Sequence, residues 1–435
     1  MLTRVLKSIA VVCFCISLAA DAHGQATPLR DAVECWSRGG LPNAIAKLKS
    51  GSEVHIAYLG GSITEQNGWR PKTLDWFKKE FPKANIVEIN AAIGGTGSDL
   101  GVYRFNHDVL DRKPDLLFVE FAVNDGGAPP DRIIKAMEGI VRQTWRANPA
   151  TDICFVYTLT EGMLPDLEGG HVPRAASTME QVADHYSIPS IHMGLEVARL
   201  HHAGKVIFSG PLPKTDAEKA AAGDKIVFSG DGVHPYPETG HQLYLESVVR
   251  SMADIRKSGK TGKHPLPAPL ATDNWEQAKM VPLSALKPGS DWQKLDPATH
   301  QLAQRFQGRM AELWKANKPG AGLTFRFKGT SLAVYDLLGP DCGQISVTID
   351  DKAPVTVSRF DAFSNYHRLG TLSIADGIPN TIHTVTLRIL PEQPNKLQIL
   401  HIRKENDYIK ELDPKVYNDI AWYAGAVLLI GDLVE

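Results

Sequence analysis

The chain has 435 residues, of which 43% are hydrophobic and 22% are charged, ordinary proportions for a soluble globular protein. This composition excludes a mostly disordered chain, a collagen-like repeat and a protein with several membrane spans. The 47 basic and 49 acidic side chains leave a formal charge of −2, which gives no reason to expect nucleic acid or an anionic membrane as a partner. At roughly 150 residues per domain, two or three domains are expected.

The first residues carry the pattern of an export signal. Arg4 and Lys7 precede an apolar run over residues 8–20, and residues 20–22 (Ala-Asp-Ala) fit a signal-peptidase cleavage site. The run is too short to cross a bilayer comfortably. We therefore predict a signal peptide over residues 1–24 and a secreted or periplasmic protein with no stable membrane insertion after cleavage. An N-terminal membrane anchor is the alternative.

Between residues 25 and 255, short apolar runs alternate with helical stretches. Strands are predicted at residues 54–59, 86–90, 116–121, 153–157 and 190–192, and helices at residues 69–81, 133–147, 175–185 and 236–255. Apolar strands that alternate with helices are typical of parallel strands buried on both faces. The sequence therefore predicts an α/β domain with three layers and a parallel sheet.

The chain changes character after residue 255. Residues 256–275 are rich in Pro, Gly and Lys, and three prolines between residues 265 and 269 indicate a semi-rigid linker. In residues 276–435, apolar and polar residues alternate in several runs, at residues 323–327, 345–349, 355–357 and 385–389. Such runs, separated by Gly, Asp and Pro, predict an antiparallel β-sandwich or jelly-roll domain.

Cysteine spacing gives no support for a metal or redox site. Cys35, Cys154 and Cys342 lie outside the predicted signal peptide, and no two of them are in C-x-x-C spacing. We expect no metal, no cofactor and at most one disulfide. Cys154 lies in an apolar run and is interpreted as a small buried side chain.

Four short blocks are placed where an α/β sheet holds its site. Residues 59–64 (Leu-Gly-Gly-Ser-Ile-Thr) and 90–98 follow the first two predicted strands, and residues 119–125 end the third. Residues 231–235 (Asp-Gly-Val-His-Pro) directly precede the last helix. Open α/β sheets bind their ligands at the carboxyl ends of the strands, so we expect these blocks to meet at one edge.

The first and last blocks contain the residues of a nucleophilic site. Ser62 is on a turn between a strand and a helix, which exposes its hydroxyl group. A serine hydroxyl is a poor nucleophile unless a base removes its proton, and His234 is the candidate base. Asp231 lies three residues before His234, close enough to hold one imidazole nitrogen and fix the tautomer.

The remaining blocks offer donors for an oxyanion. Gly95 lets a backbone N–H approach the substrate without a side chain in the way. The side-chain amide of Asn124 is a second donor, and the N–H of Ser62 at the start of a helix is a third. The four blocks together therefore predict acyl transfer through Ser62, although each block alone is more often a turn or a helix cap.

The order and content of these blocks resemble those of the SGNH hydrolases, the GDSL-type esterases and lipases. The Ser, Gly, Asn and His of that family match Ser62, Gly95, Asn124 and His234, and Asp231 matches its triad acid. The resemblance covers roughly residues 52–255. It implies a flavodoxin-like three-layer sandwich with a five-stranded parallel sheet, and ester hydrolysis through an acyl-enzyme without a metal.

One residue departs from the family pattern, because Gly61 replaces the Asp of Gly-Asp-Ser. That Asp is neither nucleophile, base nor oxyanion donor, so only the local support of the turn is in question. Members with a signal peptide and a β-sandwich often deacetylate polysaccharides. The resemblance therefore implies an acetylated carbohydrate or another small-acyl ester as substrate.

Three other functions remain open on the sequence alone. The first is an acylhydrolase for lipid or aryl esters, and the second is a glycan-binding protein without activity. The third is a nucleotide-binding oxidoreductase, supported only by the glycines of residues 94–97, whose spacing differs from G-x-G-x-x-G.

Other polar and aromatic side chains are interpreted without a chemical role. His201 and His202 are expected on the surface without acidic partners, and His241 in a structural hydrogen bond. Arg70 is expected in a surface ion pair or against a polar group of the substrate, and Glu120 beside the sheet. The aromatic residues of the C-terminal region are expected to pack in the core more often than to stack on a sugar: Trp314, Tyr335, Tyr366, Trp422 and Tyr423.

Overall fold

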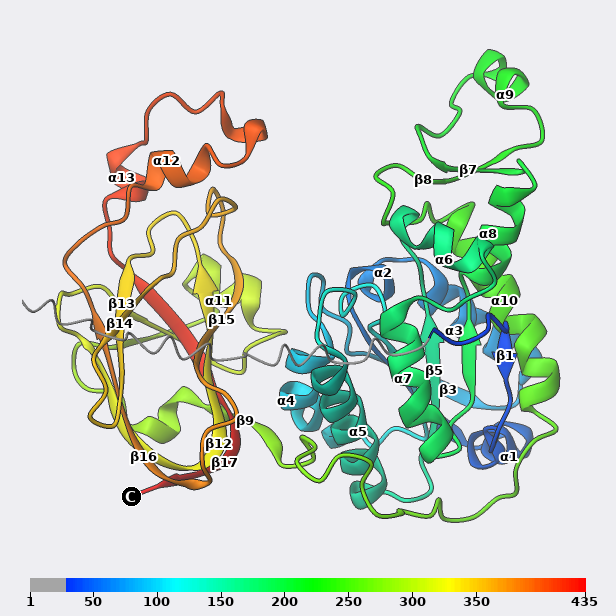
Figure 1. Cartoon of the computed structure of the whole chain (residues 1–435), viewed down its shortest axis with the longest axis horizontal. Coiled ribbons are helices and arrows are strands. Elements are labelled where there is room, and N and C mark those ends of the chain that lie inside the picture. Colours follow the sequence, from blue (N-terminus) through cyan, green and yellow to red (C-terminus); the bar gives the residue numbers. More distant parts are fainter. Residues whose placement is uncertain (1–28) are drawn as a thin grey trace, which may run out of the picture.

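The computed structural model describes residues 29–435, apart from the side chains of residues 219, 221 and 222, and the predicted signal peptide lies outside the described residues. Figure 1 shows two lobes: an α/β lobe, ending with α10, and a β lobe, beginning with β9. No helix among residues 29–435 has both the length and the apolar character needed to cross a membrane.

The α/β lobe is built on a six-stranded sheet with the order β1-β6-β5-β4-β2-β3. Its strands are β1 (Cys35–Trp36), β2 (Glu53–Gly60), β3 (Asn85–Asn90), β4 (Leu116–Glu120), β5 (Asp152–Tyr157) and β6 (Ser190–His192). Five strands are parallel and only the edge strand β1 is antiparallel. The order of the parallel strands is that of flavodoxin-like sheets, which confirms the predicted fold class.

Helices cover both faces of this sheet (Figure 1). One face packs against α1 (Pro42–Ser50), α3 (Trp69–Glu80), α8 (Leu195–His202) and α10 (Gly240–Ile255). The other packs against α4 (Ser98–Asp108), α5 (Pro130–Ala147) and α7 (Arg174–His185). All residues of β4 and β5 are buried, as expected for central strands with helices on both sides.

Shorter elements complete the α/β lobe and the loops of the β lobe. A small parallel pair, β7 (Val206–Ser209) and β8 (Ile226–Ser229), projects from the lobe together with α9 (Asp216–Ala222). The other short helices are α2 (Ser62–Glu65), α6 (Leu164–Glu168), α11 (Gln301–Phe306), α12 (Lys396–Leu400) and α13 (Pro414–Tyr417). Single 3-10 turns occur at Leu110–Arg112, Glu161–Met163, Leu283–Leu286 and Lys404–Asn406. The predicted helix over residues 236–255 begins only at Gly240, after the turn that follows β8.

The β lobe is one antiparallel sheet that curls onto itself, in the order β10-β11-β17-β12-β16-β13-β14. In addition, β15 pairs with β12, and β9 pairs with β17. The strands are β9 (Ala278–Pro282), β10 (Gln293–Leu295), β11 (Leu313–Ala316), β12 (Gly322–Leu338), β13 (Gln344–Ile349), β14 (Val355–Ser358), β15 (Arg368–Ala375), β16 (Thr381–Ile389) and β17 (Trp422–Val434). The antiparallel β prediction is confirmed, with the two layers formed by a single bent sheet.

The bend is made by the long strand β12, which changes partner along its length. Its residues 322–329 pair with β16, whereas residues 332–338 pair with β15. The first stretch ends at Gly329, where a Cβ atom would stand 2.2 Å from the carbonyl oxygen of Ile430. Glycine is required here because the neighbouring backbone of β17 comes too close for any side chain.

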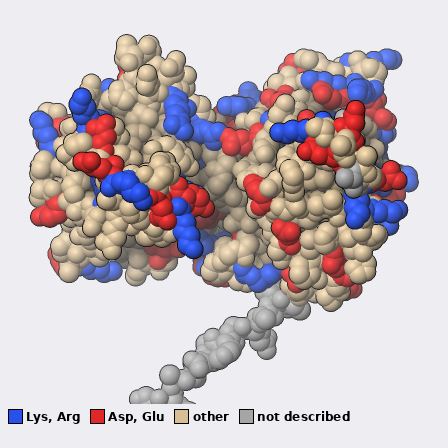
Figure 2. Space-filling model, turned by 90° about the horizontal axis from the view of Figure 1, so that it is seen from above, with Lys and Arg blue, Asp and Glu red and all other residues tan. Residues whose placement is uncertain are grey.

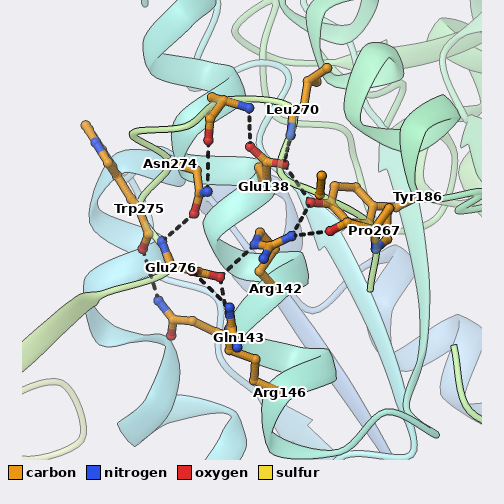
Figure 3. Close-up of polar contacts among 12 residues, drawn as sticks. Glu138, Arg142, Gln143, Arg146, Tyr186, Pro267, Leu270, Asn274, Trp275 and Glu276 are labelled. Carbon is orange, nitrogen blue, oxygen red and sulfur yellow. Dashed lines mark hydrogen bonds and ion pairs between the residues drawn. The ribbon is translucent and has the colours of Figure 1, made fainter. Parts of the chain in front are cut away.

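The segment between the lobes is bound along α5 and does not hang free (Figure 3). Buried Glu138 accepts hydrogen bonds from the N–H groups of Leu270 (2.5 Å) and Ala271 (2.8 Å). Arg142 donates to the carbonyl oxygen of Pro267 (2.9 Å) and pairs with Glu276 (2.6 Å). These contacts fix the end of the segment that leads into β9.

The two lobes also share one hydrophobic core. A single cluster of buried residues includes members of α4 and α5, together with Trp275 and residues of β9, β12 and β17. The hydroxyl groups of Tyr103 on α4 and Ser331 on β12 lie 3.0 Å apart within this contact. The β lobe is therefore fixed against the α4 side of the sheet, next to the loop that precedes α4.

Candidate active site

Ser62 lies at the carboxyl end of β2, where the chain turns into the short helix α2. The side chains of Ile63 and Thr64 are buried behind this turn, and Thr64 donates a hydrogen bond to Glu120 (2.9 Å). The buried side chains anchor the turn, so the backbone holds the half-buried Ser62 at the edge of the sheet.

His234 and Asp231 reach Ser62 from the loop between β8 and α10. The Nε2 atom of His234 lies 2.8 Å from Oγ of Ser62, and its Nδ1 atom lies 2.7 Å from Oδ2 of Asp231. Ser62 and His234 are 172 residues apart in the chain, and the folded sheet brings them into hydrogen-bond distance. The structure thus joins all three residues in one chain of hydrogen bonds.

The loop holds Asp231 in a single orientation. Its Oδ1 atom accepts hydrogen bonds from the backbone N–H groups of Val233 (2.9 Å) and His234 (2.8 Å). Partial burial raises the pKa of Asp231, but these bonds and the one from the His234 ring outweigh it and hold the pKa well below its usual range. Asp231 is therefore an anion that only accepts, so the Nδ1 atom of His234 carries the hydrogen and Nε2 is free to accept the proton of Ser62.

The proposed oxyanion donors come from three segments of the chain, at Ser62, Gly95 and Asn124. The N–H of Ser62 is at the start of α2, and the side chain of Asn124 packs against the backbone of Gly61. Gly95 has a φ of 74°, and a Cβ atom there would meet nothing within 4 Å. Glycine is thus favoured at position 95 by the left-handed backbone, and the space beside its Cα is open in the structure.

The departure from Gly-Asp-Ser has a local structural reason. A Cβ atom on Gly61 would stand 2.0 Å from Oδ1 and 2.7 Å from Cγ of Asn124. The glycine therefore leaves the space that the Asn124 side chain fills beside the nucleophile turn. The turn is supported instead by the Thr64 hydrogen bond to Glu120.

Asp125 supports the site and was not singled out from the sequence. Its Oδ1 atom accepts a hydrogen bond from the N–H of Ser98 (3.0 Å), which joins the start of α4 to the loop after β4. Burial raises its pKa to about 6 against the effect of that bond. Its position directly after Asn124 was the available signal, since the sequence Asn-Asp-Gly favours a turn, where an Asp side chain often accepts a hydrogen bond from a backbone N–H.

Glu120 is buried beneath the nucleophile turn, with 1% of its surface exposed. It accepts hydrogen bonds from Thr158 (2.7 Å) and Thr64 (2.9 Å). Burial raises the pKa of its carboxyl to about 7, although both bonds oppose that change. Glu120 thus links β4, β5 and the turn that carries Ser62.

We expect Glu120→Gln to remove part of the pH dependence of folding. The pKa of Glu120 is about 7 in the folded protein against 4.5 when unperturbed. The folded state therefore binds this proton more tightly, and stability falls as the pH rises from about 4.5 to about 7, by up to the order of 3 kcal/mol. Glutamine is neutral throughout, so urea unfolding at pH 5 and pH 8 should differ less for the variant.

The exposed Glu246 on α10 provides the matched control, because Glu246→Gln removes a carboxylate that is already in water. Its unfolding free energies should follow those of the unmodified protein at both pH values. Equal pH slopes for Glu120→Gln and the unmodified protein would contradict the shifted titration of Glu120.

The contacts of His241 and Arg70 decide two of the other sequence interpretations. His241 is buried in a structural role, accepting from the N–H of Trp69 (3.0 Å), and burial lowers its pKa to about 3. Arg70 is buried too, and pairs with Glu88 while donating to the carbonyl of Thr64 (3.0 Å). Arg70 therefore stabilises the turn that carries Ser62. The ion pair was expected at the surface, and that position is wrong because Arg70 is buried.

The expectation for the histidine pair was wrong in one respect. His201 and His202 are at the end of α8, but Nδ1 of His201 lies 2.7 Å from a carboxylate oxygen of Glu168. The acidic partner comes from α6, 33 residues away in sequence, so no local pattern pointed to it.

One group among the described residues offers three ligand types for a metal: Asp341, Cys342 and His367. Asp341 already accepts hydrogen bonds from Tyr423 (2.6 Å) and the ring of His367 (2.6 Å). Burial raises the pKa of the Cys342 thiol well above its usual value, which favours the protonated form. These hydrogen bonds join the loop after β12 to His367, which directly precedes β15, and to Tyr423 of β17.

A cleft of about 1140 Å³ lies between the two lobes. Its α/β wall includes the glycine loop, which we define as residues 94–97, and its β wall includes Phe306, Phe363 and Tyr366. Phe363 and Tyr366 are 44% and 47% exposed, whereas Tyr335, Trp422 and Tyr423 are buried in the core. Figure 2 shows the molecule hollowed between the lobes, with charged side chains of both signs nearby.

Comparisons with known proteins bear on the family and the fold of this chain. Residues 58–243 match the model of the GDSL-like Lipase/Acylhydrolase family. The curated relative is an uncharacterized lipoprotein, YqeF of Bacillus subtilis (strain 168), 37% identical over 76 residues. That match covers 16% of this chain and 31% of the relative, so the chain spans about a third of its length.

Solved structures share the fold of both lobes. A two-domain esterase (CEX) active on acetylated mannans, co-crystallized with mannopentaose, is similar over 92% of this chain and 97% of its own, with 21% identity and a TM-score of 0.67. A second structure of such an esterase gives 20% identity, 92% and 98% coverage and a TM-score of 0.68. The family match confirms the resemblance found in the sequence: residues 58–243 form a domain of the GDSL-like lipase/acylhydrolase family.

Proposed function

We propose that this protein is an exported serine esterase that removes O-acetyl groups from a polysaccharide. The observation that carries the proposal is the chain of hydrogen bonds from Asp231 through His234 to Ser62, at 2.7 and 2.8 Å. In this proposal Ser62 is the nucleophile, His234 the general base and Asp231 the group that orients the imidazole.

In the first half of the reaction, Oγ of Ser62 attacks the carbonyl carbon of the acetyl group as His234 Nε2 accepts the hydroxyl proton. The N–H groups of Ser62 and Gly95 and the amide of Asn124 stabilise the negative charge on the carbonyl oxygen. The tetrahedral intermediate then breaks its bond to the sugar oxygen, which takes the proton from His234. The sugar leaves as an alcohol and the acetyl group remains on Ser62.

In the second half, water attacks the acetyl carbon and transfers a proton to His234. Collapse of the second tetrahedral intermediate breaks the ester bond to Ser62, whose oxygen recovers the proton from His234. Acetate is released and the serine is restored. Water is the co-reactant that balances the second step, and the proton that His234 accepts is returned in each half of the reaction.

The substrate class is supported by the second lobe and the cleft. The structures that share both lobes belong to an esterase described as active on acetylated mannans. In this chain the cleft reaches from the glycine loop to the exposed rings of Phe363 and Tyr366, which offer apolar faces to a sugar. Export is supported by the N-terminal charge and apolar pattern, together with the lipoprotein relative.

The direct test is acetate release from a panel of acetylated polysaccharides, with Asn124→Ala as the variant. We expect release from at least one polymer, and a kcat lowered by about 10²- to 10³-fold in the variant because one oxyanion donor is lost. The control is Asn106→Ala, which removes an exposed amide bonded to Asp111 (3.3 Å).

The control should release acetate at the rate of the unmodified protein. A preference for long acyl chains over acetyl in a nitrophenyl ester series would replace the acetylesterase proposal with that of a lipid acylhydrolase. Full activity of Asn124→Ala would remove Asn124 from the oxyanion site.

A further inference from the structure

The last residue of α2, Glu65, connects three separated parts of the chain. Its Oε2 atom accepts a hydrogen bond from the N–H of Gly94 (2.8 Å), and its Oε1 atom pairs with Arg309 of the β lobe. Glu65 is three residues after Ser62, a spacing that on sequence resembles a capping box. In the structure, the Glu65 carboxylate does not cap its own helix and instead accepts a hydrogen bond from the glycine loop.

The glycine loop depends on this contact for its position over Ser62. A Cβ atom on Gly94 would stand 2.7 Å from Oε2 of Glu65 and 3.4 Å from Cβ of Ser62, so the loop runs directly across the nucleophile turn. The N–H of Ile93 is held by the carbonyl of Gly60 (3.0 Å) on the other side. The proposed oxyanion donor at Gly95 follows immediately after the peptide that Glu65 holds.

Arg309 reaches Glu65 from a firmly placed part of the β lobe. Its own N–H donates to the carbonyl of Phe306 (2.9 Å) at the end of α11, and the next residue, Met310, is buried in the core shared by both lobes. Its side chain is 33% exposed and that of Glu65 is 31% exposed, so water screens the pair only in part. The guanidinium group can therefore direct and neutralise the carboxylate at the same time.

We infer that Arg309 is a positioning residue for the esterase reaction, acting through Glu65 on the oxyanion site. The inference rests on the proposed function. Without a cationic partner, the Glu65 carboxylate beside Gly94 would repel the negative charge that forms on the carbonyl oxygen of the substrate. The guanidinium group of Arg309 neutralises the charge of Glu65. It also fixes the carboxylate that orients the glycine loop. The β lobe thereby contributes to catalysis on any acetyl ester, whether or not it binds the alcohol part of the substrate.

The test measures kcat and KM for 4-nitrophenyl acetate, a substrate too small to need the cleft. Arg309→Leu should lower kcat by about 10-fold, less than the loss of a whole oxyanion donor, with little change in KM. Arg309→Lys should recover most of the rate, because an ammonium group can still pair with Glu65. In a Glu65→Gln background, Arg309→Leu should cause no further loss, because the residue it acts through is changed already.

Arg132→Leu is the matched control. Arg132 is 37% exposed and pairs with Asp376 across the lobes (2.6 Å), but its partners are Asp376 and Asp99 and not Glu65. It should keep its kcat, which separates the inference from a general loosening of the lobes. Equal effects of the two Leu variants, or full additivity with Glu65→Gln, would overturn it. Ser62→Ala in the same assay tests the proposed function separately, because loss of the nucleophile should remove the activity whether or not Arg309 has a positioning role.

Discussion

Replacing Ser62 with alanine is expected to lower esterase kcat by about 10⁴-fold to 10⁶-fold. The variant keeps His234 and Asp231 but has no oxygen at the point 2.8 Å from Nε2, so no acyl-enzyme can form. The loss of one hydroxyl from a half-buried side chain should leave the fold unchanged. The measurement is the rate of acetate release, together with circular dichroism of both proteins.

Ser50→Ala is the matched control, because Ser50 is an exposed serine on α1 that donates only to the nearby carbonyl of Lys47 (2.8 Å) and contacts Ser52. A fluorophosphonate should modify the unmodified protein and Ser50→Ala at the peptide that contains Ser62, and should not modify Ser62→Ala. If Ser62→Ala kept more than about one hundredth of the activity, another group would be the nucleophile.

The parallel sheet was predictable because its central strands are buried on both faces. The residues of β4 and β5 are all buried, so they appear in the sequence as continuous apolar runs. Strand β17 is also buried on both faces and was missed. Its Tyr423, Ala426 and Leu428 enter the core shared by the lobes, and Trp422 and Val427 enter the core of the β lobe. Because both faces of β17 pack in a hydrophobic core, its sequence lacks the alternation of apolar and polar residues that is typical of an antiparallel strand.

Helix α4 was missed for a related reason. Its residues include Arg104, which is 1% exposed and pairs with Asp108 (2.7 Å), and Tyr103, which meets the β lobe. A helix that packs against the sheet on one side and another lobe on the other keeps little solvated surface, and in α4 only Asn106 and His107 are exposed. Its sequence therefore lacks the apolar stripe by which an amphipathic helix is recognised.

The candidate site was predictable where its residues lie in short blocks at strand ends. Ser62, Asn124 and His234 stand in loops that parallel topology brings to one edge, so their meeting needed no side-chain detail. The ion pair between Glu65 and Arg309 could not be predicted in this way, because the two residues are 244 positions apart and lie in different lobes. Its formation depends on how the β lobe packs on α4, which no local pattern encodes.

Asp231→Asn is expected to lower kcat by about 10⁴-fold while leaving KM nearly unchanged. The reason lies in the loop geometry. The N–H groups of Val233 (2.9 Å) and His234 (2.8 Å) both donate to Oδ1, so the carbonyl oxygen of the asparagine should take that place. Its NH₂ group then faces Nδ1 of the imidazole, where the carboxylate oxygen was an acceptor at 2.7 Å.

A donor facing Nδ1 forces the imidazole hydrogen onto Nε2, the atom that must accept the proton of Ser62. The base is then in the wrong tautomer even though each heavy atom keeps its position. Asp254→Asn, at an exposed aspartate on α10 paired with Lys257, should keep full activity and serves as the matched control. The two backbone donors fix the orientation of the asparagine amide, so its NH₂ group must face the ring. A loss of less than about tenfold in Asp231→Asn would therefore mean that another group orients His234.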